Sequence, residues 1–478
     1  MNYLVSRSSQ ENSIQKAINS YLHSITPTTN LFVGFSGGLD SSVLLHALTT
    51  ELKTLNLSLP LHAIYINHGI QDESSLWAEH CRNVCESLNI NFIALSIDLG
   101  SFNRQGLESK ARQLRYKAFE KVMDDYGVLE ACLITGHHQR DQAETLLLNL
   151  FRGSGIGGLS AMPSDKAKKF TKSDGQLINY THSRPLLNVP YSELQTYASQ
   201  YNLSFVEDKS NQDDHYRRNY IRLNVLPGLK DVWPKVQANI ANTASNVQEA
   251  SILLDRLAQD ALQKMNFTPS FIELVDFEMF DWIEQKNIIR FWFKVYWPNT
   301  VLNRAHYDWI LDAFDNYAMS KNSDYRYQLK LGELRFYQSR LYYLPKQAEP
   351  FEIEFILGSN EINLDGCESN DFFDDSKGFY FFNNRITPGV KVKLRSVSAC
   401  DEINRKKLKA FFQKNKIPSW ERKVWPVMEF SDKSIAVLGC NKCQATPVLM
   451  DNSQNFRGEN NTFYLNYCQR LSLMKLLK

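Results

Sequence analysis

A short glycine-containing segment, residues 36–42 (SGGLDSS), has the residue types needed to bind an anion. Its adjacent glycines, Gly37 and Gly38, let the backbone approach a ligand closely and turn N–H groups toward it. The serine hydroxyls add donors, and a helix that starts near Asp40 would direct the positive end of its dipole to the same point. This combination predicts a phosphate-binding loop.

Asp40 is an acid at a position where a phosphate site would ordinarily use a base, and the segment lacks the Gly-Lys-Ser/Thr ending of a Walker A loop. A carboxylate beside phosphates is explained by a divalent cation that both groups bind. A helix end supplies roughly half a charge, whereas ATP carries about four negative charges at neutral pH. We therefore expect Mg²⁺ to accompany ATP. The alternative is a strand–helix turn in which Asp40 only caps the helix.

A second polar group occurs at residues 136–145 (GHHQRDQAET). On a helix, His138, Asp141 and either Glu144 or Thr145 would share one face, because residues three and four apart are neighbours there. The alternative is a polar first turn in which acids merely favour the helix dipole.

The elements that must position these groups alternate between strands and helices. Strand-like apolar runs occur at 31–35, 61–67, 91–97 and 129–135, and helical patterns at 11–24, from 39 onward, at 75–88, at 107–126 and up to about 151. This alternation predicts an α/β fold with a parallel sheet, whose ligands bind at the carboxyl ends of the strands. Because Ser36, His68 and the pair His137 and His138 each follow such a strand, we expect one site there.

The remainder of the chain is predicted to be less regular at first and then helical. The basic stretch 163–176 is expected to be a flexible loop, and 207–222 a solvated connector. Residues 225–262 and 275–320 are predicted to be helical, 325–365 to form strands, and the acidic stretch 370–377 to form a loop. The aromatic residues of the helical part are expected to form its core rather than a stacking platform; they are Trp282, Phe291, Trp292, Phe293 and Trp297.

A chain of 478 residues is long enough for two to four domains. We expect three: a nucleotide-binding domain at 1–222, a mainly helical domain at 223–345, and a linker with a small α+β domain at 346–478, whose core is about 389–460. The polar N-terminus and the lack of a long apolar run predict no secretion signal and no membrane span. Eight cysteines indicate no disulfide framework, which suits a reducing cytoplasm. Cys440 and Cys443 form a single CxxC, and no set of four zinc ligands is evident.

The net charge of +2 excludes a global attraction to nucleic acid, so an RNA site must be a local patch. The best candidate is the basic helix expected at 404–423, which has eight bases and one acid between 405 and 423. Its candidate phosphate contacts are Arg405, Lys406, Lys407, Lys409 and Lys414. The alternative is an ordinary amphipathic helix with a solvated basic side.

Several motifs together resemble one family. Residues 36–42 resemble the pyrophosphate loop of the N-type ATP pyrophosphatases. Residues 136–162 are similar to the second signature of the tRNA(Ile)-lysidine synthetases, usually HHxDDQxET followed by RGSG and GLxxM. Further similarities are GLESKARQLRY (106–116), RPLL (184–187), EDKSN (207–211), RNYIR (218–222) and a C-terminal stretch that begins KKLKAFFQKNKIP (406–418). This sequence departs from the pattern at Arg140, where the family usually has the first Asp.

The resemblance implies an enzyme that converts the wobble cytidine of a CAU-anticodon isoleucine tRNA to lysidine. It would use ATP and free L-lysine, pass through an adenylated cytidine, and release AMP and pyrophosphate. A cytoplasmic location is implied, and the resemblance is compatible with a homodimer. Two alternatives remain open: another adenylating tRNA-modifying enzyme such as a thiolase, and a non-catalytic RNA-binding protein with a degenerate loop.

The resemblance also assigns roles to residues. The implied ATP-binding residues are Ser36, Gly37, Gly38, Leu39, Asp40 and Ser41. The implied catalytic residues are Asp40, Arg112, His138, Asp141 and Arg218, with Asp40 and Asp141 as the metal ligands.

Overall fold

The computed structural model describes residues 12–67, 74–97, 107–128, 130–173, 176–208, 212–265, 267, 271–319, 325–337, 339–345, 352–356, 361–363, 379–383, 391–400, 403–415, 417, 419–423, 425–431, 433, 435–440, 448–449 and 461–466. His68, Cys443 and the acidic stretch 370–377 lie outside these residues. The chain divides into two compact units, Met1–Leu254 and Asp255–Lys478. We expect three domains, that is, three parts that each fold on their own. The division into two compact units does not test independent folding, so the three-domain expectation stays a prediction.

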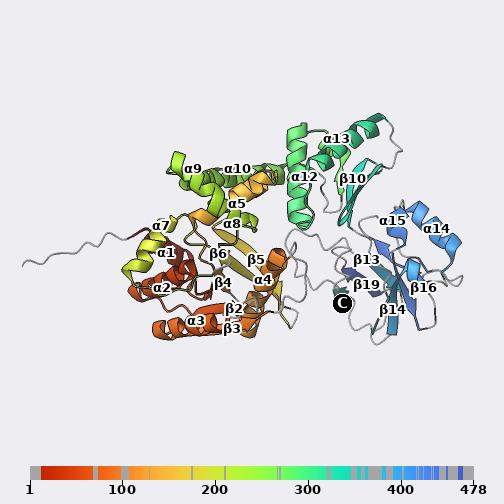
Figure 1. The fold of residues 1–478 in the computed structure, drawn as a ribbon. Helices are drawn as coiled ribbons and strands as arrows, with labels where there is room; N and C mark the ends of the chain where they lie inside the picture. The colour runs from red at the N-terminus through yellow and green to blue at the C-terminus, as the bar shows by residue number, and fades with distance from the viewer. Residues whose placement is uncertain are drawn as a thin grey trace, which may run out of the picture. The chain divides into compact units, whose positions relative to one another are not determined.

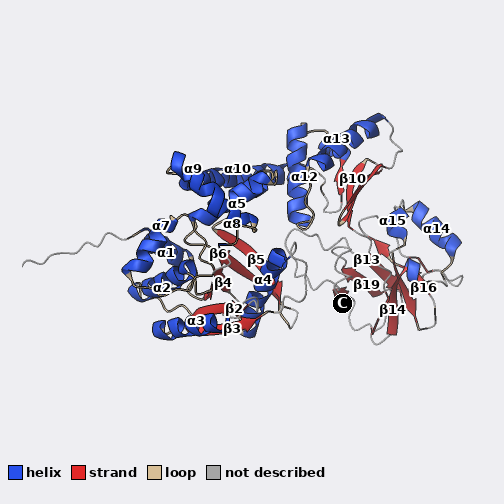
Figure 2. Ribbon diagram, viewed as in Figure 1, coloured by secondary structure: helices blue, strands red, loops and turns tan. Residues whose placement is uncertain are grey.

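The first unit is built on a single sheet (Figures 1 and 2). Its strands are β1 (Asn30–Gly34), β2 (Leu61–Asn67), β3 (Asn91–Ser96), β4 (Ala131–Ile134), β5 (Asp165–Thr171) and β6 (Leu177–Ser183). They lie in the order β3-β2-β1-β4-β6-β5, and all neighbours are parallel except β5, which runs antiparallel to β6. This order confirms the predicted α/β fold.

The described α-helices between residues 12 and 264 are α1 (Ser13–Ser24), α2 (Leu39–Thr54), α3 (Ser74–Leu88), α4 (Leu107–Asp125), α5 (Gln139–Phe151), α6 (Ile156–Leu159), α7 (Tyr191–Gln200), α8 (Arg217–Tyr220), α9 (Leu226–Val232) and α10 (Val236–Lys264). Helices α1, α2, α3 and α7 pack on one face of the sheet and α4 on the other. Helix α10 crosses the boundary between the two units. The side chains of β1 alternate between two cores, because successive strand residues point to opposite faces. Leu31 and Val33 pack with α1, α2, α3 and α7, whereas Phe32 packs with α4.

The expectation of a flexible loop at 163–176 is wrong, because residues 165–171 form strand β5. Its backbone pairs with β6 along the register from Asp165 opposite Ser183 to Thr171 opposite Leu177. Phe170 packs into the core with Ile178 and Tyr180. Lysines suit such an edge strand because their charges discourage pairing with another chain. The basic composition of this segment indicated a loop, but in the structure the lysines belong to an edge strand and protect the edge of the sheet.

The second unit contains helices and three antiparallel or mixed sheets. Its helices are α11 (Leu274–Phe277), α12 (Trp282–Tyr296), α13 (Arg304–Met319), α14 (Arg405–Lys414) and α15 (Ser419–Arg422). Its strands are β7 (Phe271–Glu273), β8 (Tyr325–Leu329), β9 (Gly332–Tyr337), β10 (Arg340–Pro345), β11 (Glu352–Ile356), β12 (Glu361–Asn363), β13 (Phe379–Asn383), β14 (Lys391–Ser396), β15 (Pro426–Phe430), β16 (Ile435–Val437), β17 (Gly439–Cys440), β18 (Val448–Leu449) and β19 (Asn461–Asn466). The sheets are ordered β7-β10-β9-β8, β11-β14-β15-β16-β18 and β12-β19-β13-β17.

Two predictions for this unit are confirmed. Trp292, Phe293 and Trp297 are buried in one hydrophobic core, against which Trp282 and Phe291 pack. Helix α14 is amphipathic: its apolar face, which includes Leu408, is buried, and most of its basic side chains are exposed. The helix expected at 404–423 nevertheless ends at Lys414, and residues 419–422 form the separate helix α15. Within the described part of the chain, no helix has the length and apolar character that a membrane crossing requires.

Candidate active site

The loop between β1 and α2 has the geometry of an anion cradle. Gly37 adopts a φ of +78°, a left-handed conformation that favours glycine, and Gly38 caps α2 without a side-chain hydrogen bond. The Ser36 and Ser41 hydroxyl oxygens lie 3.2 Å apart, and Ser41 Oγ donates to the Gly38 carbonyl at 3.0 Å. The first-turn N–H groups of α2 have no partner within the helix, so they are available to a ligand.

Segments that are distant in sequence pack against this loop and hold it in place. The Val206 N–H donates to the Gly37 carbonyl at 2.9 Å, which ties the connector after α7 to the loop. A Cβ at Gly37 would lie 2.8 Å from Cys81 Sγ and 2.9 Å from Val206 Cγ2. Burial, with the neighbouring Cys85 adding to it, raises the pKa of the Cys81 thiol to about 12, so Cys81 is a neutral packing group rather than a nucleophile.

Replacing Gly37 with alanine is expected to lower kcat/KM for ATP at least about tenfold, because the methyl would push the loop away from Cys81 and Val206. The left-handed backbone adds a destabilisation of about 1–2 kcal/mol. Steady-state kinetics and thermal unfolding measure the two effects. The matched control is Gly155→Ala, whose Cβ would meet nothing within 4 Å. If Gly37→Ala and Gly155→Ala had similar kcat/KM values and melting temperatures, the close packing at Gly37 would not be what positions the loop.

Asp40 and His138 face each other across the carboxyl ends of β1 and β4. His138 Nε2 lies 3.4 Å from Asp40 Oδ2 and 3.4 Å from Asp141 Oδ2. The His138 side chain is fully buried, and neither ring nitrogen has a hydrogen-bond partner; the same is true of the buried Asp40 Oδ1. A Cβ at Gly136 would lie 2.8 Å from the Asp40 carbonyl oxygen, so only glycine lets β4 approach α2 this closely. The predicted convergence of the loop at Ser36 with His137 and His138 is therefore found in the structure, whereas His68 lies outside the described residues.

Asp141 is the second carboxylate beside His138, in the first turn of α5. Its Oδ2 accepts the His138 backbone N–H at 3.0 Å, and its Oδ1 accepts an N–H from Arg218 at 2.8 Å. Burial by itself would raise the pKa of this carboxyl, but its electrostatic interactions with His138 and Arg218 outweigh burial and hold the pKa well below its usual range. Asp141 is thus a permanent anion that orients its neighbours.

Glu144 joins the same network from the next turn of α5. It is fully buried and accepts from Arg218 Nε at 2.7 Å and from Arg222 Nε at 2.7 Å. The second arginine follows the first by four residues, which places both on one side of the short helical segment after residue 216. The sequence analysis placed Glu144 or Thr145 on one face with His138 and Asp141 but gave Glu144 no role, and it included Arg222 only as part of a motif. The i, i+4 spacing of the two arginines was a usable signal.

Arg140, which departs from the family pattern, has a structural partner. Its guanidinium carbon lies 3.6 Å from the centre of the Tyr191 ring, and its Nε lies 3.8 Å from Glu144 Oε1. The Tyr191 ring in turn packs against the ring of His138, with centroids 5.1 Å apart. Arg140 therefore buttresses the aromatic side chain beside His138.

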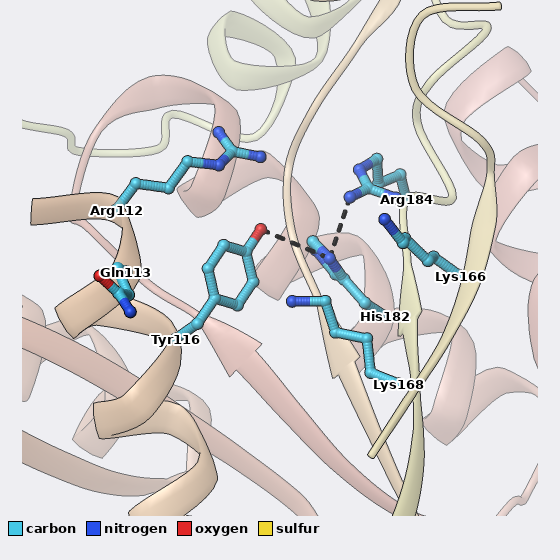
Figure 3. Close-up of a pocket in the computed structure, with 7 residues that line it drawn as sticks. All are labelled: Arg112, Gln113, Tyr116, Lys166, Lys168, His182 and Arg184. Atoms are coloured by element: carbon cyan, nitrogen blue, oxygen red, sulfur yellow. Dashed lines mark hydrogen bonds between the residues drawn. The ribbon is translucent and has the colours of Figure 1, made fainter. Parts of the chain in front are cut away.

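Arg112 lies in a different place, where it lines a cavity of about 300 Å³ between α4, β5 and β6 (Figure 3). The other lining residues include Tyr116, Lys166, Lys168, His182 and Arg184. A hydrogen-bond chain leads from this cavity to the end of β4. Arg184 donates to His182 Nδ1 at 2.9 Å, and Thr135 Oγ1 lies 2.9 Å from His182 Nε2 and 2.8 Å from His137 Nδ1.

The residues present fit a magnesium ion that is shared with a substrate. Asp40 Oδ1 is a buried carboxylate oxygen without a partner, and magnesium is commonly held by one or two carboxylates together with phosphate and water. Asp40, His138 and Asp141 do not form a cage that could hold a metal by themselves. Among the described residues, only the exposed group Asp213, Asp214 and His215 has three such ligand atoms within 4.8 Å of one another.

The comparisons with known proteins agree over most of the chain. Residues 7–229 match the family model of the PP-loop domain, and residues 399–456 match the TilS substrate C-terminal domain. A tRNA(Ile)-lysidine synthase of Hydrogenovibrio crunogenus is 36% identical over 429 residues, which cover 89% of this chain and 97% of that protein. A tRNA(Ile)-lysidine synthase of Coxiella burnetii is 32% identical over 435 residues, covering 89% of this chain and 92% of that protein.

One solved structure is also similar, the U34-tRNA thiolase NcsA from Methanococcus maripaludis with its 4Fe-4S cluster. It is 20% identical, covers 49% of this chain and 78% of its own, and has a TM-score of 0.38. A similarity this low carries no argument about function.

Proposed function

Because this chain belongs to the tRNA(Ile)-lysidine synthase family, and is therefore an ATP-using enzyme that forms lysidine in tRNA, we propose how its residues carry out the reaction. The proposed substrates are the wobble cytidine of a CAU-anticodon isoleucine tRNA, ATP and free L-lysine. The proposed products are lysidine, AMP and pyrophosphate.

In the first proposed step, the 2-carbonyl oxygen of cytosine attacks the α-phosphate of ATP and pyrophosphate leaves. This step converts a poor leaving group, the carbonyl oxygen, into a good one, AMP. The proposed ATP contacts are those of the β1–α2 loop, Ser36, Gly37, Gly38, Leu39, Asp40 and Ser41. Their N–H groups and hydroxyls would stabilise the charge that develops on the pyrophosphate.

In the second step, the side-chain amine of lysine attacks C2 of the cytosine ring; a C–N bond forms and the C–O bond to AMP breaks. The amine has a reference pKa of about 10.4, so it must lose a proton before it attacks. We propose that His138 accepts or relays this proton, because both of its buried ring nitrogens lack a hydrogen-bond partner. Asp141 would hold His138 in place through the contacts described above.

A magnesium ion at Asp40 would neutralise phosphate charge and polarise the α-phosphate. Asp40 offers the free oxygen for it, and Asp141 is the proposed second carboxylate because each of its oxygens keeps a further lone pair. Arg218 uses two of its five N–H donors on Asp141 and Glu144. Its remaining donors are proposed to reach the α-phosphate of ATP. Arg112, which lines the separate cavity described above, is proposed to make a ribose-phosphate contact.

The observation that carries this proposal is the position of His138 between Asp40 and Asp141, at 3.4 Å from each, beside a glycine loop that begins a helix. Helix α14 in the second unit is the proposed contact for the tRNA backbone, through Arg405, Lys406, Lys407, Lys409 and Lys414. Their side chains lie on the polar side of this helix, whose apolar side is buried.

The test is pyrophosphate release from ATP and Mg²⁺ with CAU-anticodon isoleucine tRNA, with and without L-lysine, followed by nucleoside analysis of the tRNA. We expect turnover that depends on lysine, with lysidine in the product. Tight tRNA binding without pyrophosphate release would instead indicate a non-catalytic RNA-binding protein. Adenylation whose rate does not depend on lysine, and which gives a modified nucleoside only when a sulfur donor is added, would indicate a thiolase.

A further inference from the structure

We propose that the cavity between α4, β5 and β6 binds a backbone phosphate of the tRNA strand that carries the modified nucleotide. Figure 3 shows the cationic side chains reaching toward this cavity from two sides, Arg112 from α4 and Lys166, Lys168 and Arg184 from the β5–β6 hairpin. The identity of the RNA rests on the proposed function; the affinity for a phosphate rests on the cavity itself.

The cavity suits an anion because four cationic side chains line it and, among the described residues, none of them is in an ion pair. Glu120 acts electrostatically on Lys168, and Asp165 on Arg184, but neither forms an ion pair with them. Each of these acids accepts a hydrogen bond from another residue: Glu120 from Tyr180 Oη at 2.9 Å, and Asp165 from Ser183 Oγ at 2.5 Å. Arg184 is only 4% exposed, and its Nε is buried without a hydrogen-bond partner. A buried donor of this kind is costly unless a ligand satisfies it.

The remaining lining side chains keep these cations in place without cancelling their charge. Burial, followed by the charge of Arg184, lowers the pKa of His182 to about 2, so its ring is neutral. Because Arg184 donates to His182 Nδ1, the proton of this ring is on Nε2, which donates to Thr135 Oγ1. Thr135 is then free to donate to His137 Nδ1. An anion bound at Arg184 would thereby be linked to the end of β4, beside His138.

The distribution of exposure favours a nucleic-acid backbone over a small ligand. Arg112 and Lys166 at the rim are exposed, whereas Arg184 and His182 at the base are buried. A polyanion can enter such a funnel with one phosphate while its neighbours stay at the rim. The phosphates of ATP already have the cradle at residues 36–41. Free lysine carries two ammonium groups and one carboxylate, so its net charge is positive and four cations would repel it overall.

The test compares two variants of the same strand. Lys166→Gln/Lys168→Gln removes two cavity charges, whereas Lys169→Gln removes a charge from the opposite face of β5. The binding of isoleucine tRNA transcript is measured by fluorescence anisotropy over a range of salt concentrations, without ATP. The KM values for ATP and lysine are measured in turnover.

We expect the double variant to weaken tRNA binding at least about tenfold at low salt and to reduce the slope of log affinity against log salt by about 1.4, or about 0.7 per lost contact. Lys169→Gln should leave both values near those of the wild type. Arg112→Gln, on another element, should weaken tRNA binding in the same direction. The KM values for ATP and lysine should change by less than about twofold in the double variant.

Three outcomes would overturn the inference. An equal loss of tRNA affinity in Lys169→Gln would indicate that any positive charge on this strand contributes, wherever it points. A selective rise in the KM for ATP in the double variant would make the cavity part of the nucleotide site, and unchanged tRNA binding in a double variant with a wild-type melting curve would show that the cavity does not bind tRNA. Because binding is measured without turnover, the result does not depend on lysidine formation. A wild type that makes no lysidine would refute the proposed reaction and leave the phosphate result standing.

Discussion

Replacing Asp40 with asparagine is expected to lower kcat for lysidine formation about a thousandfold, equivalent to about 4 kcal/mol of transition-state stabilisation. The amide keeps the shape of the side chain but removes the charged oxygen that the proposed metal and its phosphates require. Asp40 is 40% exposed at the start of α2, so the fold should tolerate the change. Pyrophosphate release at saturating ATP, with thermal unfolding as a check on the fold, measures the effect.

The matched control is Asp125→Asn, at the exposed end of α4. It should retain wild-type kcat. If raising the Mg²⁺ concentration partly restores Asp40→Asn, the loss lies in metal affinity, as proposed. An Asp40→Asn enzyme with full activity would remove Asp40 from the metal and phosphate assignment, and the loop would then be a structural turn with a capping acid.

Replacing Glu144 with alanine is expected to destabilise the first unit by about 3–5 kcal/mol, because the change leaves two partly buried arginines without their shared carboxylate. For a unit of this size the melting temperature should fall by roughly 6–20 °C. Activity should also fall, since Arg218 would be left with Asp141 as its only described carboxylate. Differential scanning calorimetry and steady-state kinetics measure the two effects.

Glu86→Ala serves as the control for this variant, because Glu86 is an exposed glutamate of α3. Its melting temperature should be the same as that of the wild type. A more informative companion is Glu144→Gln, which keeps the volume and one acceptor oxygen and should lie between the wild type and Glu144→Ala. If all three variants melted together, Glu144 would not be the residue that anchors the two arginines.

The fold class could be predicted because its signals are local. The run at 31–35 is apolar on both faces, which is typical of a central strand covered by helices on each side, and β1 is such a strand. The positions of Ser36 and His138 followed from one rule, that parallel strands present their carboxyl ends at the same edge. The glycine loop and the polar first turn of α5 were therefore brought together correctly without knowledge of any contact.

The strand at 165–171 could not be predicted from its composition. Three lysines in seven residues indicate a solvated loop when the segment is considered alone. In the folded unit, β6 offers an open edge of N–H and C=O groups, and pairing with it satisfies the backbone of the segment. The decision depended on a neighbour in space, which local composition does not encode.

By itself, then, the sequence determined the α/β fold, the loop at residues 36–41, the edge at which His138 and Asp141 lie, and the buried face of α14. Tertiary structure alone decided which charges are paired. Arg218 and Arg222 reach Glu144 across more than seventy residues of chain, whereas the cations around Arg184 form no ion pair within the part of the chain that the structure describes. The physical reason is that patterns of apolar and polar residues fix burial locally, but a buried charge is stabilised only by the partner that the completed fold brings to it.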